Sequence, residues 1–151
     1  MDTITIVDAS LQDIPELVQL LNELFTIEKD FQPDAKHQVR GLSMLIEQPS
    51  LGVIKVARNS QGNVIGMVSA QLVISTAQGA PSAWVEDMVV NQQSRGTGVG
   101  RALLDEILQW AREKGATRAQ LLVDSENEPA LGYYAHLGWK TTQLQARRVF
   151  L

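Results

Sequence analysis

Hydrophobic residues recur along the chain with two periods, and each change of period marks a boundary between predicted elements. Alternation with a period of two predicts strands at 4–7, 52–57, 64–74, 83–90 and 118–124. Stripes with a helical period predict helices at 10–25, 35–47, 99–114 and 127–138. The pattern after the last helix predicts one or two closing strands within 139–151.

Polar residues and glycines set the limits of these elements. Ser10 and Asp13 have the spacing of a capping box at the start of the first helix, and Asn127 is placed to cap the last one. The stretch 58–63 is rich in Asn, Ser and Gly and predicts a hairpin turn. The stretch 75–82 predicts a loop between two further strands.

The order of these elements predicts an α/β (α+β) fold with a mixed, twisted sheet of six or seven strands and about four helices. The order is strand, two helices, three strands, helix, strand, helix and two closing strands. A chain of 151 residues, 44% of them hydrophobic, is large enough for one core. Without repeats or linkers, we expect a single domain over 1–151.

Composition excludes several classes of function. The chain has no cysteine, which excludes disulfides, thiolate metal sites and a cysteine nucleophile. The two histidines, His37 and His136, have no partner at metal-ligand spacing, so no metal site is expected. A net charge of −4 disfavours nucleic-acid binding. The lack of a long apolar run or a signal-peptide pattern predicts a cytoplasmic protein without a membrane segment.

The stretch "SRGTGVGRALL" places three glycines, Gly96, Gly98 and Gly100, directly before a predicted helix. Unpaired N–H groups at such a helix start favour an anion, although a tight turn without a ligand would use the same residues. A P-loop is excluded because no lysine follows the glycines. A dinucleotide fingerprint is disfavoured, because Arg101 or Leu103 stands where its last glycine belongs.

A third pattern fits the glycines better. Residues 95–100 match the spacing Arg/Gln-x-x-Gly-x-Gly/Ala, and "NEPALGYYAHLGW" matches Asn-x-x-Ala-x-x-x-Tyr-x-x-x-Gly-Phe/Trp. Together with the strand "WVEDMVV" before the glycines, these segments resemble the GNAT superfamily of N-acetyltransferases. The resemblance extends over essentially the whole chain and is least informative across 1–80. The residues in register in the second segment are Asn127, Ala130, Tyr134, Gly138 and Trp139.

The resemblance implies acetyl-coenzyme A as cofactor. Backbone N–H groups of the glycine stretch would hold its pyrophosphate, and Arg95 and Arg101 would add positive charge or remain solvated. Backbone groups of the strand would pair with the pantetheine arm, and one of their N–H groups would polarise the thioester carbonyl. The expected cofactor-binding residues are Met88, Val89, Val90, Arg95, Gly96, Thr97, Gly98, Val99, Gly100, Arg101, Asn127 and Tyr134.

The resemblance also implies catalytic residues. Strand alternation predicts that Trp84, Glu86 and Met88 share one face and that Val85, Asp87 and Val89 share the other. We expect Glu86 to be the general base and Asp87 a supporting acid, with the reverse assignment left open. We expect Tyr134 to be the general acid that protonates the departing thiolate.

The acceptor would be a primary amine of a small molecule or peptide, attacked directly in a ternary complex. Acidic residues that could attract it are mixed with basic ones, so they are interpreted as a solvated loop: Glu28, Lys29, Asp30, Asp34, Lys36 and His37. Phe25, Phe31 and Trp84 would line an apolar pocket or belong to the core. The runner-up function is a non-catalytic acyl-CoA-binding module. A homodimer could form through a closing strand.

Overall fold

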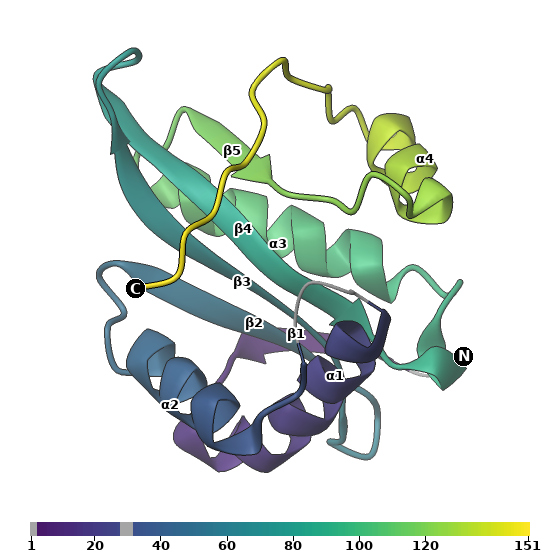
Figure 1. Cartoon of the computed structure of the whole chain (residues 1–151). Coiled ribbons are helices and arrows are strands. Elements are labelled where there is room, and N and C mark those ends of the chain that lie inside the picture. The colour runs from purple at the N-terminus through teal and green to yellow at the C-terminus, as the bar shows by residue number, and fades with distance from the viewer. Residues whose placement is uncertain (1–2, 28–31) are drawn as a thin grey trace. The chain divides into compact units, whose positions relative to one another are not determined.

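The structure is a computed structural model that describes residues 3–27 and 32–151. The chain forms two compact units, Met1–Leu121 and Leu122–Leu151, and each is described by itself. Among the described residues, the first unit contains these elements (Figure 1): β1 (Thr5–Asp8), α1 (Ile14–Ile27), α2 (Ala35–Ile46), β2 (Gly52–Arg58), β3 (Val64–Ser75), β4 (Ala80–Val90), α3 (Val99–Glu113) and β5 (Arg118–Leu121).

The strands form one mixed sheet in the order β1-β2-β3-β4-β5. Strands β1 to β4 pair antiparallel in sequence order, whereas β4 and β5 pair in parallel. The parallel pair needs a crossover connection, and α3 supplies it. The fold class and the order of elements through β5 are therefore as predicted, whereas the sheet of the described residues has five strands instead of six or seven.

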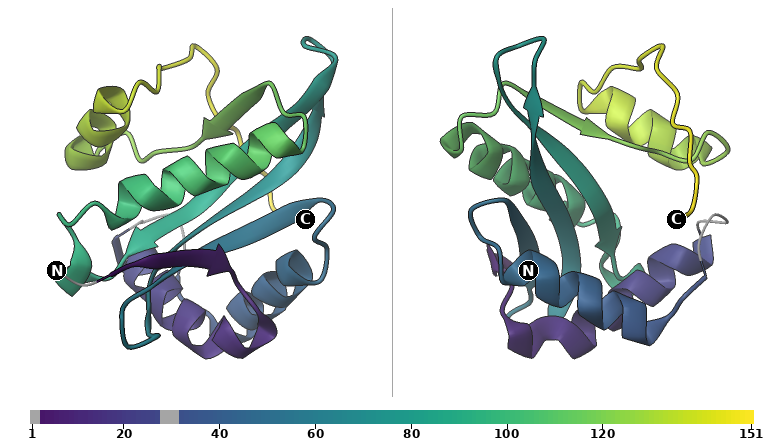
Figure 2. Two further views of the ribbon diagram at one scale, coloured as in Figure 1. Left: turned by 180° about the vertical axis from the view of Figure 1, so that it is seen from behind. Right: turned by 60° about the vertical axis from the view of Figure 1, so that its left-hand side comes forward.

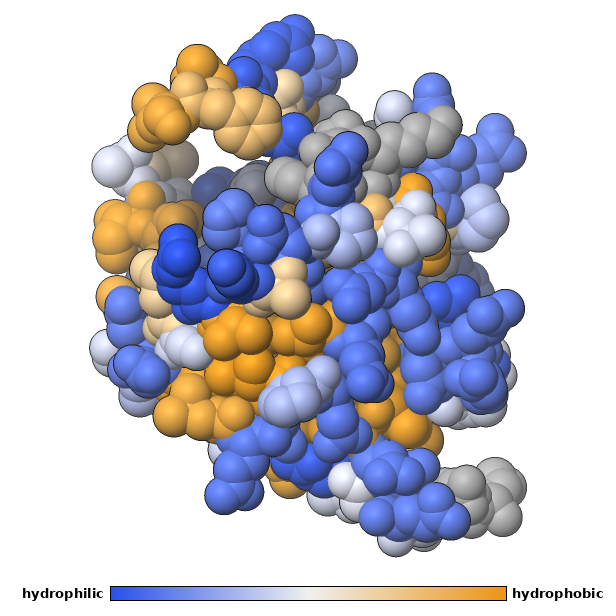
Figure 3. Space-filling model, turned by 60° about the horizontal axis from the view of Figure 1, so that its bottom comes forward, coloured by the Kyte–Doolittle hydropathy of each residue, from blue (hydrophilic) through white to orange (hydrophobic). Residues whose placement is uncertain are grey.

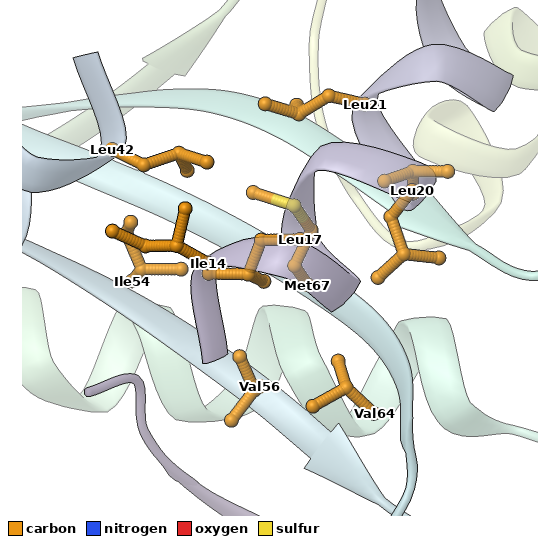
Figure 4. Packing of buried hydrophobic residues seen from close by; sticks show 10 residues of the cluster. Ile14, Leu17, Leu20, Leu21, Leu42, Ile54, Val56, Val64 and Met67 are labelled. Carbon is orange, nitrogen blue, oxygen red and sulfur yellow. The ribbon is translucent and has the colours of Figure 1, made fainter. Parts of the chain in front are cut away.

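Helices α1 and α2 cover one face of this sheet. Their inward side chains meet those of β2 and β3 in a buried cluster, and Figure 4 shows the side chains pointing toward one another. The spacing of the α1 members is that of one helical face, as the sequence predicts. The cluster contains Ile14, Leu17, Leu20, Leu21, Leu42, Ile54, Val56, Val64, Met67 and Val89.

Helix α3 covers the other face of the sheet (Figure 2). It approaches β3 closely at Gly66, where an added Cβ would lie 3.0 Å from Leu103 Cδ1 and 3.4 Å from Val99 Cγ1. Glycine at this position lets the start of α3 rest on the sheet. The start of α3 is also where the glycine stretch ends, so this packing helps to position that loop.

The second unit contains α4 (Glu128–His136). Asn127 caps this helix as predicted, because its Oδ1 accepts a hydrogen bond from the Ala130 N–H at 3.2 Å. The closing strands are a wrong prediction: residues 139–151, all described, contain no strand. An alternating pattern makes a strand only where a neighbouring backbone pairs with it. In this segment the Arg147 guanidinium donates a hydrogen bond to Gln145 Oε1, two residues earlier, at 3.1 Å.

Three other boundaries differ from the sequence prediction. Strand β5 ends at Leu121 instead of extending to residue 124. The expected loop at 75–82 shrinks to a turn, because β3 continues to Ser75 and β4 begins at Ala80. The first helix begins with a 3-10 turn (η1, Leu11–Asp13) before α1. The expectation of one domain over 1–151 and the expected homodimer stay predictions.

A buried carboxylate joins the start of the first helix to the sheet. Asp13 accepts a hydrogen bond from the Ser10 N–H at 2.8 Å and two from the Arg58 guanidinium at 2.7 and 2.8 Å. Burial disfavours the charged form of Asp13, but the Ser10 N–H and the Arg58 guanidinium outweigh it and hold the pKa of this carboxyl below its usual value.

Asp13→Asn is expected to lower the free energy of unfolding by about 2 kcal/mol at neutral pH, because the charge-assisted bonds to Arg58 are lost. Since the pKa of Asp13 is lower in the folded state, the unfolded chain binds more protons below pH 3.8. The stability that Asp13 contributes is thus fully present above that pH and is lost as the pH falls through the folded pKa. Urea unfolding of both proteins across the acidic range measures this.

Asp8→Asn is the matched control. Asp8 also accepts from a cation, Lys55 Nζ at 2.6 Å, but its side chain is 66% exposed, whereas that of Asp13 is 6% exposed. Exposed ion pairs contribute between zero and about 1 kcal/mol. Equal losses in the two variants would contradict the role given to Asp13.

Candidate active site

The glycine stretch forms a loop between β4 and α3. A 3-10 turn (η2, Gln92–Ser94) precedes it, and Gly96 and Gly98 have left-handed backbones with φ of 77° and 88°. Gly98 is the N-cap of α3 and has no side chain that could satisfy the helix N–H groups. These conformations are the reason for glycine here, because an added Cβ would meet open space at both positions.

The loop leaves backbone donors at the start of α3. The first bond of the helical ladder runs from the Ala102 N–H to the Gly98 carbonyl at 3.1 Å. The N–H groups of Val99, Gly100 and Arg101 precede that bond and have no carbonyl within the helix to bond to. Together with the helix dipole, they make this end of α3 suited to an anion.

Side chains hold the loop in this shape. Asn91 Oδ1 accepts from the Ser94 N–H at 3.0 Å, and the Thr97 hydroxyl donates to the Ser94 carbonyl at 2.5 Å. Arg95 donates from Nε to the Val90 carbonyl at 3.0 Å, and its Nη2 lies 3.8 Å from the Glu23 carboxylate. Part of the Arg95 guanidinium therefore braces the loop, while the Arg101 side chain is exposed.

Strand β4 contains a β-bulge that the sequence did not reveal. Met67 and Ser69 of β3 lie opposite Val89 and Glu86 of β4, so two β4 residues stand where β3 has one. Asp87, one of those two, has φ of 54°, which residues other than glycine rarely adopt. Aspartate tolerates this conformation better than most residues.

The bulge corrects the predicted faces of β4. Because partners in register point to the same side, Glu86 and Val89 share the face of Ser69 and Met67, which is the face that α1 and α2 cover. Strict alternation put Glu86 and Val89 on opposite faces, and the extra residue is the reason that it fails.

Glu86 lies just before the bulge with an exposed side chain. Its Oε1 accepts a hydrogen bond from Trp84 Nε1 at 2.6 Å, which orients the carboxylate. Its backbone carbonyl accepts from the Ser69 hydroxyl at 3.1 Å, which fixes the strand at this point.

Asp87 lines a cavity of about 520 Å³ on the same side of the sheet. Leu21 and Phe25 of α1 contribute to its wall, together with residues of α2, β2 and β3. Glu86 and Asp87 therefore both lie on the side of the sheet that α1 and α2 cover, and Asp87 borders the cavity.

The register between β4 and β5 stops before the bulge. The last registered pair is Val85 with Leu121, and none is formed by residues 86–90 of β4 with described residues of the first unit. Of the backbone partners expected for the cofactor, Met88 and Val90 are half-buried and Val89 belongs to the core cluster. A strand whose pairing ends in this way offers backbone groups to an extended ligand.

The remaining predicted catalytic residue lies in the second unit. Tyr134 of α4 packs edge-to-face against Tyr133 and Trp139, with ring centroids 5.6 and 5.9 Å away. Gly138 follows the helix with φ of 94°. The backbone N–H of Trp139 then donates a hydrogen bond to the backbone carbonyl of Tyr134 at 3.0 Å. The segment "YYAHLGW" thus builds a local aromatic cluster around Tyr134.

The charged acceptor loop is described only in part, because 28–31 lie outside the described residues. Asp34 caps α2 by accepting from the His37 N–H at 3.1 Å, so it has a local structural role. Sequence reasoning missed Gln38, which is buried and donates to Asn22 Oδ1 at 3.1 Å. Its signal was a polar residue on the inward side of an amphipathic helix.

Among the described residues, no helix is both long and apolar enough to cross a lipid bilayer.

Comparison with known proteins gives several N-acetyltransferases as relatives. A glucosamine 6-phosphate N-acetyltransferase of Trypanosoma brucei brucei is 34% identical over 89 residues, which are 57% of this chain and 57% of that protein. The thialysine N-epsilon-acetyltransferase of Mus musculus is 26% identical over 143 residues, which are 87% of this chain and 81% of that protein. Some curated relatives are much longer than the shared region, and the chain spans 37% and 57% of two of them.

Solved structures with a similar fold include acetyltransferases. The crystal structure of a predicted acetyltransferase with acetyl-CoA from Clostridium acetobutylicum aligns with a TM-score of 0.78 at 18% identity, covering 97% of this chain and 96% of that one. At this identity the likeness concerns the fold. Residues 14–139 match the family described as "Acetyltransferase (GNAT) family". Because this match covers most of the chain, the protein belongs to the GNAT family of acetyltransferases.

Proposed function

We propose that this protein transfers the acetyl group of acetyl-CoA to a primary amine of a small molecule or peptide in a ternary complex. The observation that carries the proposal is the glycine loop at the start of α3. Its left-handed glycines leave the N–H groups of Val99, Gly100 and Arg101 ahead of the first helical bond. The family match over 14–139 supports the same reading.

The residues present fit acetyl-CoA. The exposed backbone at 96–98 has no Cβ at Gly96 or Gly98 to keep a pyrophosphate away, and Arg101 adds a positive charge beside it. Backbone groups of Met88, Val89 and Val90 would bind the pantetheine arm, because residues 86–90 have no register partner in β5. Asn127, besides capping α4, would bind the same arm. When bound, acetyl-CoA supplies a thioester as the acetyl donor.

Three side chains would hold the acceptor amine or transfer protons. The acceptor amine is mostly protonated at neutral pH, since alkyl amines have a pKa near ~10.4. Glu86 would take its proton, directly or through water, with the carboxylate oriented by Trp84 Nε1. Asp87 borders the cavity and would hold the ammonium group in place. Tyr134 would give a proton to the departing sulfur.

A non-catalytic acyl-CoA-binding module is the alternative. It shares the glycine loop and the part of β4 beyond its register with β5, but it needs no carboxylate at the bulge. The pair Glu86 and Asp87, one oriented by an indole N–H and the other bordering a cavity, favours the enzyme.

Thermal unfolding with acetyl-CoA, CoA and NAD is expected to separate these readings from nucleotide binding. A ligand at 100 times its Kd stabilises the folded state by about 2.7 kcal/mol, so acetyl-CoA and CoA should raise Tm while NAD leaves it unchanged. Release of free thiol in the presence of amines then distinguishes the enzyme from the binding module. The absence of a shift with CoA would contradict both.

A further inference from the structure

The cavity beside Asp87 has a wall that is largely hydrophobic. Leu21 and Phe25 of α1, Leu42 and Leu45 of α2, and Leu72 of β3 all contribute to it. Figure 3 views the molecule from the side on which α1 and α2 lie in Figure 1, and hydrophobic residues there form an area bordered by hydrophilic ones. A volume of about 520 Å³ is in the range of small-molecule sites.

Among the described residues that line this cavity, Asp87 is the one carboxylate and His37 the one side chain that can carry a positive charge, and the described lining contains no lysine or arginine. A phosphate or carboxylate group of an acceptor would therefore find no permanently charged cation among the described lining residues and would lie near the like charge of Asp87, and burying a poorly paired anion is costly. An ammonium group, in contrast, has the Asp87 carboxylate as a partner of opposite charge.

Part of the polar lining is already bonded within the protein, whereas Gln48 and Gln71 also line the cavity. Gln38 accepts from the Asp34 N–H at 2.7 Å and donates to Asn22 Oδ1 at 3.1 Å and to the Val18 carbonyl at 3.4 Å. These bonds tie α2 to α1 and occupy the amide, so this part of the wall presents little hydrogen-bonding capacity to a ligand.

We propose that the acceptor is a primary monoamine with an uncharged alkyl or aryl body. This inference rests on the proposed acetyl transfer and names its substrate class. The ammonium group lies at Asp87, and the apolar body lies between α1 and α2. In the reaction a nitrogen–carbon amide bond forms and the carbon–sulfur thioester bond breaks. One ammonium and one thioester give one amide, one thiol and one released proton.

Kinetics with phenethylamine, hexylamine, glucosamine 6-phosphate and lysine test the class. The kcat/KM for the two apolar amines should exceed that for glucosamine 6-phosphate by roughly 100-fold, because only they match the wall and avoid an unpaired anion. Thiol release measures each rate. A preference for glucosamine 6-phosphate or lysine would overturn this inference and leave the proposed acetyl transfer standing.

Gly41→Phe tests the location. Gly41 of α2 lines the cavity, and an added Cβ there would meet nothing within 4 Å. A phenylalanine ring would occupy the cavity and raise the KM for phenethylamine at least about tenfold, while calorimetry finds acetyl-CoA binding unchanged. Gly41→Ala is the matched control, because it leaves the cavity open. An unchanged KM in Gly41→Phe would overturn the location.

Calorimetric titration of phenethylamine into the CoA-bound protein keeps the two proposals distinguishable. Binding that Gly41→Phe removes, in a protein without turnover on any amine, would support the cavity assignment and contradict acetyl transfer. Absence of both binding and turnover, with CoA still bound, would overturn both.

Discussion

Glu86→Gln is expected to lower kcat for acetyl transfer by a factor of about 100 to 10,000, the usual contribution of a general base. Glutamine retains the length of the side chain and an oxygen that can accept from Trp84 Nε1, so the indole contact is kept. What is lost is the ability to take a proton from the ammonium form of the acceptor. Thiol release in the presence of an amine should therefore be slower in the variant than in the wild-type protein.

Asp87→Asn is the matched comparison, because the two carboxylates are adjacent on β4. Asparagine adopts the left-handed conformation at φ of 54° as readily as aspartate does, so the bulge is retained. Since Asp87 borders the cavity, losing its charge should raise the KM for the amine more than it lowers kcat. A large loss of kcat in Asp87→Asn together with undiminished turnover in Glu86→Gln would exchange the two roles.

Tyr134→Phe tests the proposed acid separately. Phenylalanine keeps the ring that packs against Tyr133 and Trp139, so the fold of α4 should be retained. Turnover should fall while the affinity for CoA changes little, since the hydroxyl acts on the departing sulfur. Undiminished turnover in both Tyr134→Phe and Glu86→Gln would contradict the acid–base mechanism.

Gly98→Asp is expected to weaken CoA binding at least about 100-fold. Gly98 is the N-cap of α3 with a left-handed backbone, so any side chain there costs some stability, but aspartate is favoured at N-caps and tolerates such a backbone better than most residues. Its carboxylate would compete for the N–H groups that we assign to the pyrophosphate. Two like charges about 4 Å apart repel by about 4 kcal/mol at an effective dielectric of 20, which exceeds the energy of a hundredfold change.

Gly98→Asn isolates the charge in that experiment. Asparagine has nearly the same shape and tolerates the same backbone conformation, but it is neutral. A second control is Gly115→Ala at the other end of α3, where φ is 86° and an added Cβ also meets open space. Calorimetry should show the largest loss for Gly98→Asp, a smaller one for Gly98→Asn and none for Gly115→Ala. Equal affinities in all three variants would contradict the assignment of the loop.

The sequence predicted those parts of the fold that depend on local patterns. The helical stripes, the cap at Asn127 and the glycine-rich turn before α3 follow from residue type and spacing, and the structure contains them. The closing strands failed because pairing depends on a neighbouring backbone, which no local pattern encodes. Leu11 falls within the helix predicted at 10–25, but it is half exposed and lies in the 3-10 turn before α1.

The candidate site was predictable in its chemistry but less so in its geometry. Glu86 and Asp87 could be singled out because the strand "WVEDMVV" resembles the corresponding strand of the family. Its arrangement could not, because the bulge at Asp87 is visible only in the register between β3 and β4. The cavity likewise depends on residues from α1, α2, β2, β3 and β4, which come together only in the folded chain. For the same reason, the positions of Gly41 and Gln38 in the cavity wall are visible only in the folded chain.

The most direct measurement is mass spectrometry of the products formed from isotope-labelled acetyl-CoA and phenethylamine by the wild-type protein. If the chain is an amine acetyltransferase, each thiol released should be matched by one amine carrying one labelled acetyl group, and Glu86→Gln should form far less of both. Tight binding of CoA without any acetylated amine, across alkyl, aryl, sugar and peptide acceptors, would contradict it.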